Sequence, residues 1–211
     1  MFEYSLAHWT TFLSAAILLN LSPGPDMMFI LGQTAKRGVA SGFSAMFGIW
    51  TGALVHVLFA ALGLSAVLAT SATAFSFVKW AGAAYLIWLG IQALRSEGSI
   101  GQASEFSKSK GPAGVFRQGV MVSVLNPKVA VFFLAFLPQF VEPGAGPAAA
   151  QLFFHGIIII LVAALVEPPL ILMGGKIRDG LSRNNALACW IDRGIGTLFI
   201  GLGIKLAVSN R

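Results

Sequence analysis

Prolines interrupt an apolar run near the start of the chain, in the sequence Asn20-Leu21-Ser22-Pro23-Gly24-Pro25-Asp26. The run extends from Trp9 to Ala35, and Asp26 is its only charged residue. A transmembrane helix needs about 20 mostly apolar residues, so this run is long enough to cross a bilayer. Proline removes a backbone donor and clashes with the preceding turn. Two prolines around a glycine therefore predict a full break in the first membrane helix.

A later apolar run, from Gly119 to Val141, is interrupted in the sequence Val124-Leu125-Asn126-Pro127-Lys128. Irregular backbone inside a membrane is tolerated only where it is buried in protein or lines a water-filled cavity. Corresponding interruptions in the two halves of a transporter are the best sequence pointer to its binding site. The two broken segments therefore predict a site where they meet.

The two intramembrane charges beside these breaks fall at the same expected depth. Asp26 lies 11 residues before Arg37, and Lys128 lies 11 residues after Arg117. At 1.5 Å per residue, both lie roughly 16 Å inside a hydrocarbon core about 30 Å thick. Charges inside a membrane are costly and usually functional, so we expect this acid and base to line a shared cavity. The alternative is a buried ion pair that only holds two helices together.

The composition favours a multi-pass membrane protein. Hydrophobic residues make up 56% of the 211 residues and charged residues only 10%, whereas a soluble domain carries about 25% charged residues. Six apolar runs are expected to span the membrane as helices: Trp9–Ala35, Val39–Ala69, Phe75–Leu94, Gly119–Val141, Ala148–Gly175 and Ile191–Val208. The formal charge of +6 does not indicate a nucleic-acid partner, because the basic residues lie in short clusters between these runs. The predicted fold class is an all-α membrane protein with six transmembrane helices.

The distribution of Lys and Arg predicts the orientation of the spans. Ten basic residues fall on one side: Lys36, Arg37, Arg95, Lys108, Lys110, Arg117, Lys176, Arg178, Arg183 and Arg193. The opposite side has only Lys79, Lys205 and Arg211. Since positive loops stay in the cytoplasm, both termini are predicted to lie outside.

A polar stretch rich in Ser, Gly and Lys divides the chain near its middle. It predicts a cytoplasmic linker at 96–116, between a first three-helix repeat at 1–95 and a second at 117–211. An odd number of helices per half gives the halves opposite orientations in the bilayer, which is the architecture of an inverted repeat. Helices 1 and 4, the first of each repeat, are the two broken at proline-rich motifs.

Further polar and small residues in the runs have several interpretations. Glu167, followed by Pro168 and Pro169, is expected inside the membrane as a proton carrier or a ligand for a substrate amine, or else only as a partner for Lys128 or freed backbone amides. His56 and His155 fall toward the outer side, where an interfacial or packing role is favoured over a proton relay. Helix glycines are expected to permit close helix contact, namely Gly42, Gly48, Gly52, Gly82, Gly90, Gly194, Gly201 and Gly203.

The sequence lacks the residue patterns expected of the functional classes that compete with amino-acid transport. Cys189 is the only cysteine, which excludes an intramolecular disulfide and a CxxC site. A membrane-embedded enzyme would need a nucleophile with a base, or a metal, and neither HExxH nor Gly-x-Ser-x-Gly occurs. A metal exporter would want clustered carboxylates, His or Cys, and a passive channel has no need of a paired acid and base. We expect no cofactor, no bound metal and, because residues 1–10 lack Lys and Arg, no cleavable signal peptide.

The two proline motifs resemble known signatures. Ser22-Pro23-Gly24-Pro25-Asp26, with the basic turn Lys36-Arg37-Gly38, resembles the first helix of the lysine exporter superfamily, in its homoserine/threonine exporter branch. The stretch from Asn126 to Phe140 resembles the fourth-helix signature, and the stretch from Gly82 to Gly90 fits the third. The resemblance covers nearly the whole chain, but the Glu167-Pro168-Pro169 sequence has no place in that pattern.

This resemblance implies a proton-driven secondary exporter of amino acids or amino-acid derivatives in the bacterial inner (plasma) membrane, and not an enzyme. The implied partners are an amino-acid substrate and the lipid bilayer, with a homodimer left open. The candidate substrate-binding residues are Pro23, Gly24, Pro25, Asp26, Asn126, Pro127, Lys128 and Glu167, of which Asp26 and Glu167 are also candidates for proton coupling. A divalent-metal exporter of the same superfamily and a membrane-embedded enzyme are the alternatives.

Overall fold

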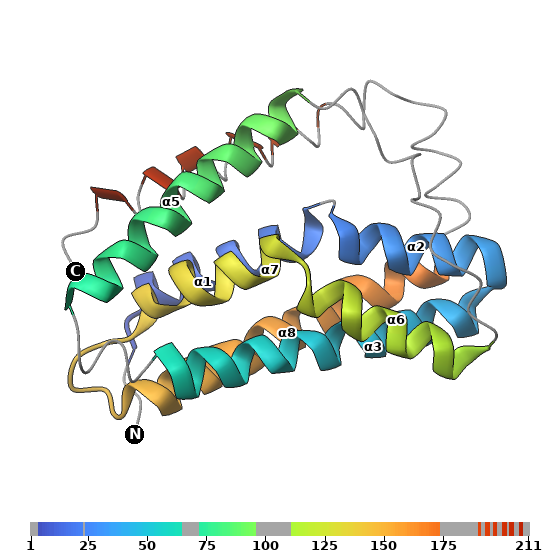
Figure 1. Ribbon diagram of the computed structural model, residues 1–211, viewed down its shortest axis with the longest axis horizontal. Helices are drawn as coiled ribbons and strands as arrows, with labels where there is room; N and C mark the ends of the chain where they lie inside the picture. Colours follow the sequence, from blue (N-terminus) through green and yellow to red (C-terminus); the bar gives the residue numbers. More distant parts are fainter. Residues whose placement is uncertain are drawn as a thin grey trace.

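The structure is a computed structural model that describes residues 4–22, 24–64, 72–95 and 111–173, together with part of 190–208. Every regular element in these ranges is helical, which confirms the predicted all-α class for the described residues. Figure 1 shows the helices running side by side along the longest axis of the molecule.

The first apolar run folds as two helices. Helix α1 (Leu6–Leu21) begins after Ser5, whose hydroxyl accepts the backbone N–H of His8. Helix α2 (Pro25–Arg37) begins at the second proline of the motif, and its axis is bent by 47° from that of α1. The predicted break in the first helix is therefore confirmed.

The fourth predicted span is broken in the same way. Helix α6 (Pro112–Val124) is followed by α7 (Pro127–Val131), and the two parts of this span are bent by 49°. After α7 the chain continues as a π-helical turn, η3 (Phe132–Phe136), and then a 3₁₀ turn, η4 (Leu137–Phe140). A proline inside each apolar run therefore has the same consequence for the helix axis, because neither run can keep its hydrogen-bond ladder across the ring.

Two further helices are long and apolar enough to cross a membrane without a break. One is α3 (Val39–Phe59), which continues into the π-helical turn η1 (Ala60–Leu64), and the other is α8 (Ala148–Leu172). If each bent pair is one span, the described residues contain up to four spans. The predicted third helix is present as α5 (Ala72–Arg95). The described residues support a multi-pass membrane protein with two to four spans, and the threading of six spans stays a prediction.

Parts of the sequence-based prediction lie outside the described residues. Most of the expected linker at 96–116 lies outside the described residues, but its last part is described and contains the start of α6 at Pro112. Proline suits this first helical position, where its missing N–H costs no hydrogen bond. Among the predicted site and orientation residues, Pro23, Lys108, Lys110, Lys176, Arg178, Arg183, Cys189, Lys205 and Arg211 also fall outside.

Glycines allow α3 and α6 to approach closely. A Cβ atom added to Gly119 would lie 2.6 Å from the Ala45 carbonyl oxygen, and one added to Gly48 would overlap the Phe116 carbonyl. Neither position has room for a side chain. Close contact is likewise confirmed for Gly42, Gly52, Gly90 and Gly203. A Cβ added to Gly194 or Gly201 would meet no described residue within 4 Å, so close contact at these two glycines stays a prediction.

Two apolar clusters fill the bundle. One contains Phe12, Phe132, Phe136 and Leu152 and lies between α1, the α7–η4 segment and α8. The other lies between α2, α3 and α6 and contains Phe29, Met46 and Val115. Members of both clusters line the pocket described below, so the pocket lies where the two apolar regions meet. Helix α5 packs beside α7 and η3, along the edge of the bundle in Figure 1.

Candidate functional site

The chain is extended between α1 and α2. Ser22 (φ −63°, ψ 121°) and Gly24 (φ −169°, ψ −179°) both have extended backbone. The N–H of Ser22 still donates to the Leu18 carbonyl at 2.9 Å, but no side chain caps the start of α2. Asp26 follows in the first turn of α2, where the helix dipole stabilises a negative charge. The first break therefore places a carboxylate next to backbone amides that have no side-chain cap.

The second break has a side-chain cap of its own. Asn126 is extended (φ −75°, ψ 109°), as is typical of a residue before proline. Its Oδ1 accepts the backbone N–H of Lys128 at 3.0 Å. This N-cap satisfies one of the amides freed at the break and fixes the start of α7.

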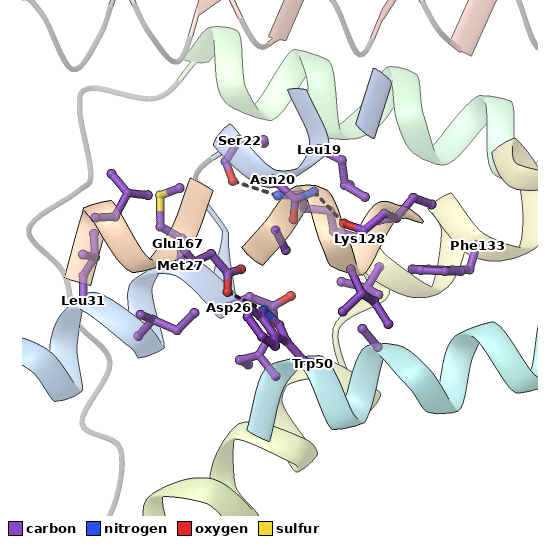
Figure 2. Close-up of a pocket in the computed structure, with 18 residues that line it drawn as sticks. Leu19, Asn20, Ser22, Asp26, Met27, Leu31, Trp50, Lys128, Phe133 and Glu167 are labelled. Carbon is purple, nitrogen blue, oxygen red and sulfur yellow. Dashed lines mark hydrogen bonds between the residues drawn. The ribbon is translucent and has the colours of Figure 1, made fainter. Parts of the chain in front are cut away.

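Lys128 reaches from the second break to the first. Its Nζ donates to the Ser22 carbonyl oxygen at 2.8 Å (Figure 2). In an unbroken helix that carbonyl would have accepted a backbone N–H, so the lysine replaces a hydrogen bond that the break removes. The side chain also lies over Gly24, where an added Cβ would be 3.3 Å from both Cδ and Nζ of the lysine. The absence of a side chain at Gly24 therefore lets the base lie close to the first break.

Asp26 shares this region with Lys128 but is not held by it. Asp26 Oδ1 is buried and has no hydrogen-bond partner among the described residues, and the same is true of Asn126 Nδ2. Within the described part of the chain, no ion pair of 4.0 Å or less joins Asp26 to Lys128. The alternative of a closed ion pair between two helices is therefore wrong for this structure.

Glu167 projects into the same region from α8. Its side chain is buried, and its Oε2 accepts the indole N–H of Trp50 at 2.7 Å (Figure 2). Trp50 belongs to α3, so this hydrogen bond links the two unbroken helices and orients the acid. The sequence suggested Lys128 or freed backbone amides as structural partners for Glu167, whereas its hydrogen-bond partner here is an indole. Helix α8 continues through Pro168 and Pro169.

These side chains line one pocket, which has a cavity volume of about 50 Å³ and is partly open to the surroundings. Its polar lining consists of Asn20, Ser22, Asp26, Trp50, Lys128 and Glu167. Apolar side chains form the rest of the wall, among them Leu19, Ile30, Ile49, Phe133 and Ile159. Figure 2 shows hydrogen bonds between pocket residues, among them Lys128 with Ser22 and Trp50 with Glu167. The pocket therefore combines both signs of charge with a large apolar surface.

The structure brings three of the predicted site residues into the pocket, namely Asp26, Lys128 and Glu167. Four others do not line it but form the two breaks that shape it: Gly24, Pro25, Asn126 and Pro127. The eighth, Pro23, lies outside the described residues.

Sequence reasoning missed three polar liners. Asn20 and Ser22 belong to the interrupted motif, and their position beside the break could have predicted that they line the pocket. Asn20 Nδ2 donates to the Ala16 carbonyl at 2.8 Å. Trp50 gave no such signal, because it lies in an uncharged apolar run, where an aromatic residue is common and does not indicate a binding site.

Metal ligands are not clustered in the described ranges. No group of three or more His, Cys, Asp or Glu side chains there could hold a metal ion. The metal-export alternative therefore has no ligand cluster to support it in that part of the chain.

Comparisons with known proteins agree over nearly the whole length. Residues 17–210 match the family model described as LysE type translocator. An uncharacterized membrane protein of Pseudomonas aeruginosa is 34% identical over 208 residues, which cover 95% of this chain and 94% of the relative. A homoserine/homoserine lactone efflux protein of Salmonella typhimurium is 31% identical over 202 residues, covering 96% and 97%. A leucine efflux protein of the same organism is 30% identical over 207 residues, covering 97% of each chain. No solved structure matches the chain.

Proposed function

The chain belongs to the LysE type translocator family, and from this premise we propose that it exports amino acids or amino-acid derivatives through the pocket between its two broken helices. It is a multi-pass membrane protein of a family of translocators, not of enzymes. One observation carries the proposal: an acid, a base and two interrupted helices meet in one pocket.

The pocket has a complement for each charged group of an amino acid. An α-ammonium needs hydrogen-bond acceptors, and Asp26 Oδ1 has no partner among the described residues. An α-carboxylate needs donors, which the uncapped start of α2 and the ammonium of Lys128 supply. Because the ammonium of lysine has three N–H donors, Lys128 can hold Ser22 and a substrate carboxylate together.

The apolar wall favours a substrate with an uncharged side chain. Leu19, Ile49 and Phe133 offer no partner for a second charge. Two relatives are named for the efflux of leucine and of homoserine or its lactone, and these substrates have neutral side chains. We therefore expect neutral amino acids, or derivatives of similar size, to be the substrates of this chain.

Proton coupling is assigned to Asp26 and Glu167, the two acids of the pocket. A proton on Asp26 removes the charge that attracts a substrate ammonium, so protonation from outside would promote release there. Glu167 keeps its orientation through Trp50, and a proton on its free oxygen leaves that hydrogen bond intact. Each transport cycle would then exchange substrate for protons at the same pocket.

The architecture that goes with this function is an inverted repeat of three helices and three helices, with both termini outside the bacterial inner membrane. Two bends of 47° and 49°, each at the first helix of a predicted half, support this arrangement. Residues 1–95 and 117–211 would form the two repeats, joined by the linker.

The oligomeric state can be tested by measuring the mass of the detergent-solubilised protein, which would be doubled for a homodimer. No described residue lies within 4 Å of a Cβ added to Gly194 or Gly201, which leaves a contact with a second copy open at these glycines.

Flux into inverted membrane vesicles tests the function. Vesicles from cells that produce the protein should accumulate labelled neutral amino acids when their interior is made acidic, and collapse of the proton gradient should abolish the accumulation. A panel should include leucine, homoserine, homoserine lactone, lysine and a divalent cation. Uptake of the cation alone would favour the metal-export alternative, and uptake that ignores the proton gradient would contradict proton coupling.

Two variants test the site separately from the function. Asp26→Asn and Lys128→Met should lose most of the flux, whereas Lys36→Met should keep it, since Lys36 is an exposed lysine at the other end of α2. Wild-type flux in both pocket variants would overturn the site and leave the export function standing. All variants should insert in the membrane at equal levels.

A further inference from the structure

Two of the three histidines of the chain meet away from the pocket. His8 lies near the start of α1 and His155 near the start of α8, and their Nε2 atoms are 2.9 Å apart. Both are buried, with 9% and 1% of their surface exposed. A hydrogen bond between two buried imidazoles links helices that are 147 residues apart in the sequence.

Hydrogen-bond chemistry fixes how many protons this pair carries at the contact. His155 Nδ1 lies 2.8 Å from the Gln151 carbonyl oxygen, which is an acceptor only, so Nδ1 carries a hydrogen. The two Nε2 atoms share one hydrogen, because one must donate and the other accept. If both Nε2 atoms carried a hydrogen, the two N–H groups would repel at this distance.

A carboxylate completes the cluster. Glu142 Oε1 lies 3.6 Å from His8 Nδ1. A bare Nδ1 lone pair facing this oxygen would be repelled, whereas an Nδ1–H is attracted to it. The arrangement therefore fits three hydrogens on the four ring nitrogens, which gives the pair one positive charge opposite Glu142.

The surroundings of the pair hold Glu142 in place and exclude water. Gln151 Oε1 accepts the backbone N–H of Glu142 at 2.9 Å and the hydroxyl of Tyr4 at 3.0 Å, and Gln151 Nε2 donates to the Glu142 carbonyl at 3.0 Å. Burial and the nearby Glu142 carboxylate raise the pKa of Tyr4 above its ordinary value of 10.0, so its hydroxyl stays a donor at neutral pH. Aromatic rings enclose the imidazoles, namely Tyr4, Trp9, Phe12 and Phe140. Among the described residues, Tyr4 and Glu142 are the titratable groups that face the pair from α1, α8 and the intervening loop.

The cluster lies at a defined distance from the pocket. His8 precedes the pocket residue Asn20 by 12 positions on α1, and His155 precedes Glu167 by 12 positions on α8. At 1.5 Å per residue, each separation is about 18 Å. The apolar cluster that contains Phe12 and Phe136 occupies the region between α1 and α8. Among the described residues, no chain of hydrogen-bonded polar side chains connects the imidazoles with the pocket, so we assign the cluster an effect on the helices and not a role in passing protons inward.

We propose that His8, His155 and Glu142 form a proton-operated latch, in which one shared hydrogen holds the start of α1 against α8 and a further proton releases it. The further proton comes from the solution through the half-exposed Glu142 and binds the Nε2 atom that accepts the shared hydrogen bond. Both Nε2 atoms then carry hydrogen, the hydrogen bond is lost, and two positive charges repel in a buried site. With both termini outside, the latch lies at the outer end of the pathway, and acid outside would open it. Only this last step rests on the proposed function.

The proton count can be measured without transport. In protein labelled with ¹⁵N-histidine and reconstituted in nanodiscs, three imidazole signals can be assigned by the variants His8→Gln, His56→Gln and His155→Gln. Between about pH 5 and about pH 8 the signals of His8 and His155 should titrate together, and replacing either one should move the midpoint of the other by about one pH unit or more. His56→Gln is the matched control, since His56 bonds the Ser123 carbonyl instead and should leave both unchanged. Independent titration of His8 and His155 would overturn the proposal.

The histidine variants could fail to fold, so a second variant leaves both imidazoles in place. Glu142 is 39% exposed in its side chain, so Glu142→Gln keeps the packing of the pair and removes the charge that favours its third hydrogen. The acid transition should then move to lower pH. An unchanged transition in Glu142→Gln would contradict the role given to the carboxylate.

Release of the helices is a second readout. Spin labels at Leu6→Cys and Ala150→Cys, both exposed positions at the starts of α1 and α8, report their separation in a Cys189→Ala background. The separation should increase through the acid transition in the otherwise wild-type protein and stay constant in His155→Gln. A constant separation in both would overturn the latch. Coupled titration without any amino-acid flux would contradict only the exporter function, and flux with independent titration would contradict only the latch.

Discussion

The two broken helices have nearly the same bend and very different chemistry at the break. The bends are 47° between α1 and α2 and 49° between α6 and α7. At the second break, Asn126 caps the new helix with its own side chain. At the first break, no side chain caps α2, and the Ser22 carbonyl depends on Lys128 from the other half of the chain.

This difference shows that an equal change of direction does not mean an equal function. At the break that carries the base, Asn126 Oδ1 caps the new helix and Lys128 is already committed to Ser22, although Asn126 Nδ2 has no partner among the described residues. The break that carries the acid has an unbonded carboxylate oxygen, Asp26 Oδ1, among the described residues. The second break is therefore the fixed side of the pocket, and the first is the side that can respond to a ligand.

The largest effect is expected at Lys128, which joins the two breaks. Lys128→Met removes a charge-assisted hydrogen bond to Ser22, worth about 1.5–3 kcal/mol, so flux into inverted vesicles should fall roughly 10- to 100-fold. Lys128→Arg keeps the charge, and it should recover part of the flux. If Lys128→Met transports like the wild type, the two breaks do not depend on this link.

Asp26 tests the open side of the pocket. Asp26→Asn keeps the shape and removes the charge that would attract a substrate ammonium, so the apparent affinity should weaken by about tenfold, the equivalent of ~1.4 kcal/mol. The measurement is the substrate concentration that gives half-maximal flux. The dependence of flux on the proton gradient should also weaken. An unchanged affinity together with unchanged proton dependence would place the ammonium elsewhere.

A smaller effect is expected at Gly24, because its neighbour is the flexible side chain of Lys128. A Cβ at this position would lie 3.3 Å from Lys128 Cδ and Nζ, so Gly24→Ala pushes the lysine by a few tenths of an ångström. Flux should fall roughly threefold, a cost of ~0.6 kcal/mol. Gly63→Ala is the matched control, since a Cβ at that position would meet no described residue within 4 Å. Equal flux in the two variants would mean that the lysine tolerates displacement.

At the cap of the second break, the expected effect is on stability and not on flux. Asn126→Ala removes the side chain that accepts the Lys128 N–H, which should cost ~1 kcal/mol of stability. Thermal unfolding followed by loss of helicity should show a midpoint lower by about 2–4 °C. Asn126→Ser restores a capping oxygen and should recover most of the loss. If the alanine and serine variants unfold alike, the cap does not stabilise the second break.

The sequence predicted the breaks well because proline acts locally. Its missing donor and fixed ring disfavour a continuous helix, so residues 23–25 and Pro127 marked both breaks without knowledge of the fold, whereas α8 continues through Pro168 and Pro169. The shared pocket of Asp26 and Lys128 followed from counting residues to the nearest basic loop. Each of these inferences needed only the chain itself and the thickness of a bilayer.

Contacts between distant helices could not be predicted in this way. The hydrogen bond between Trp50 and Glu167 joins residues that are 117 positions apart, and neither residue specifies the other by charge. The contact between His8 and His155 is more distant still, and it depends on the rotation of α1 against α8. The close glycine contact of Gly119 was missed for the same reason. Helix rotation about its own axis is a product of packing, and a run of apolar residues does not encode it.

After Pro127 the helix type changes, and this change allows the following side chains to rotate about the helix axis without a further bend of the span. Helix α7 passes into the wide π turn η3 and then the narrow 3₁₀ turn η4. A π turn holds one residue more than an α turn, so closing it would move every later position by one step, about 100° around the axis. Phe136 is the last residue of η3 and Phe140 the last residue of η4, and both side chains are buried. A slip of one residue would therefore turn the aromatic side chains that follow the π turn around the axis of the span.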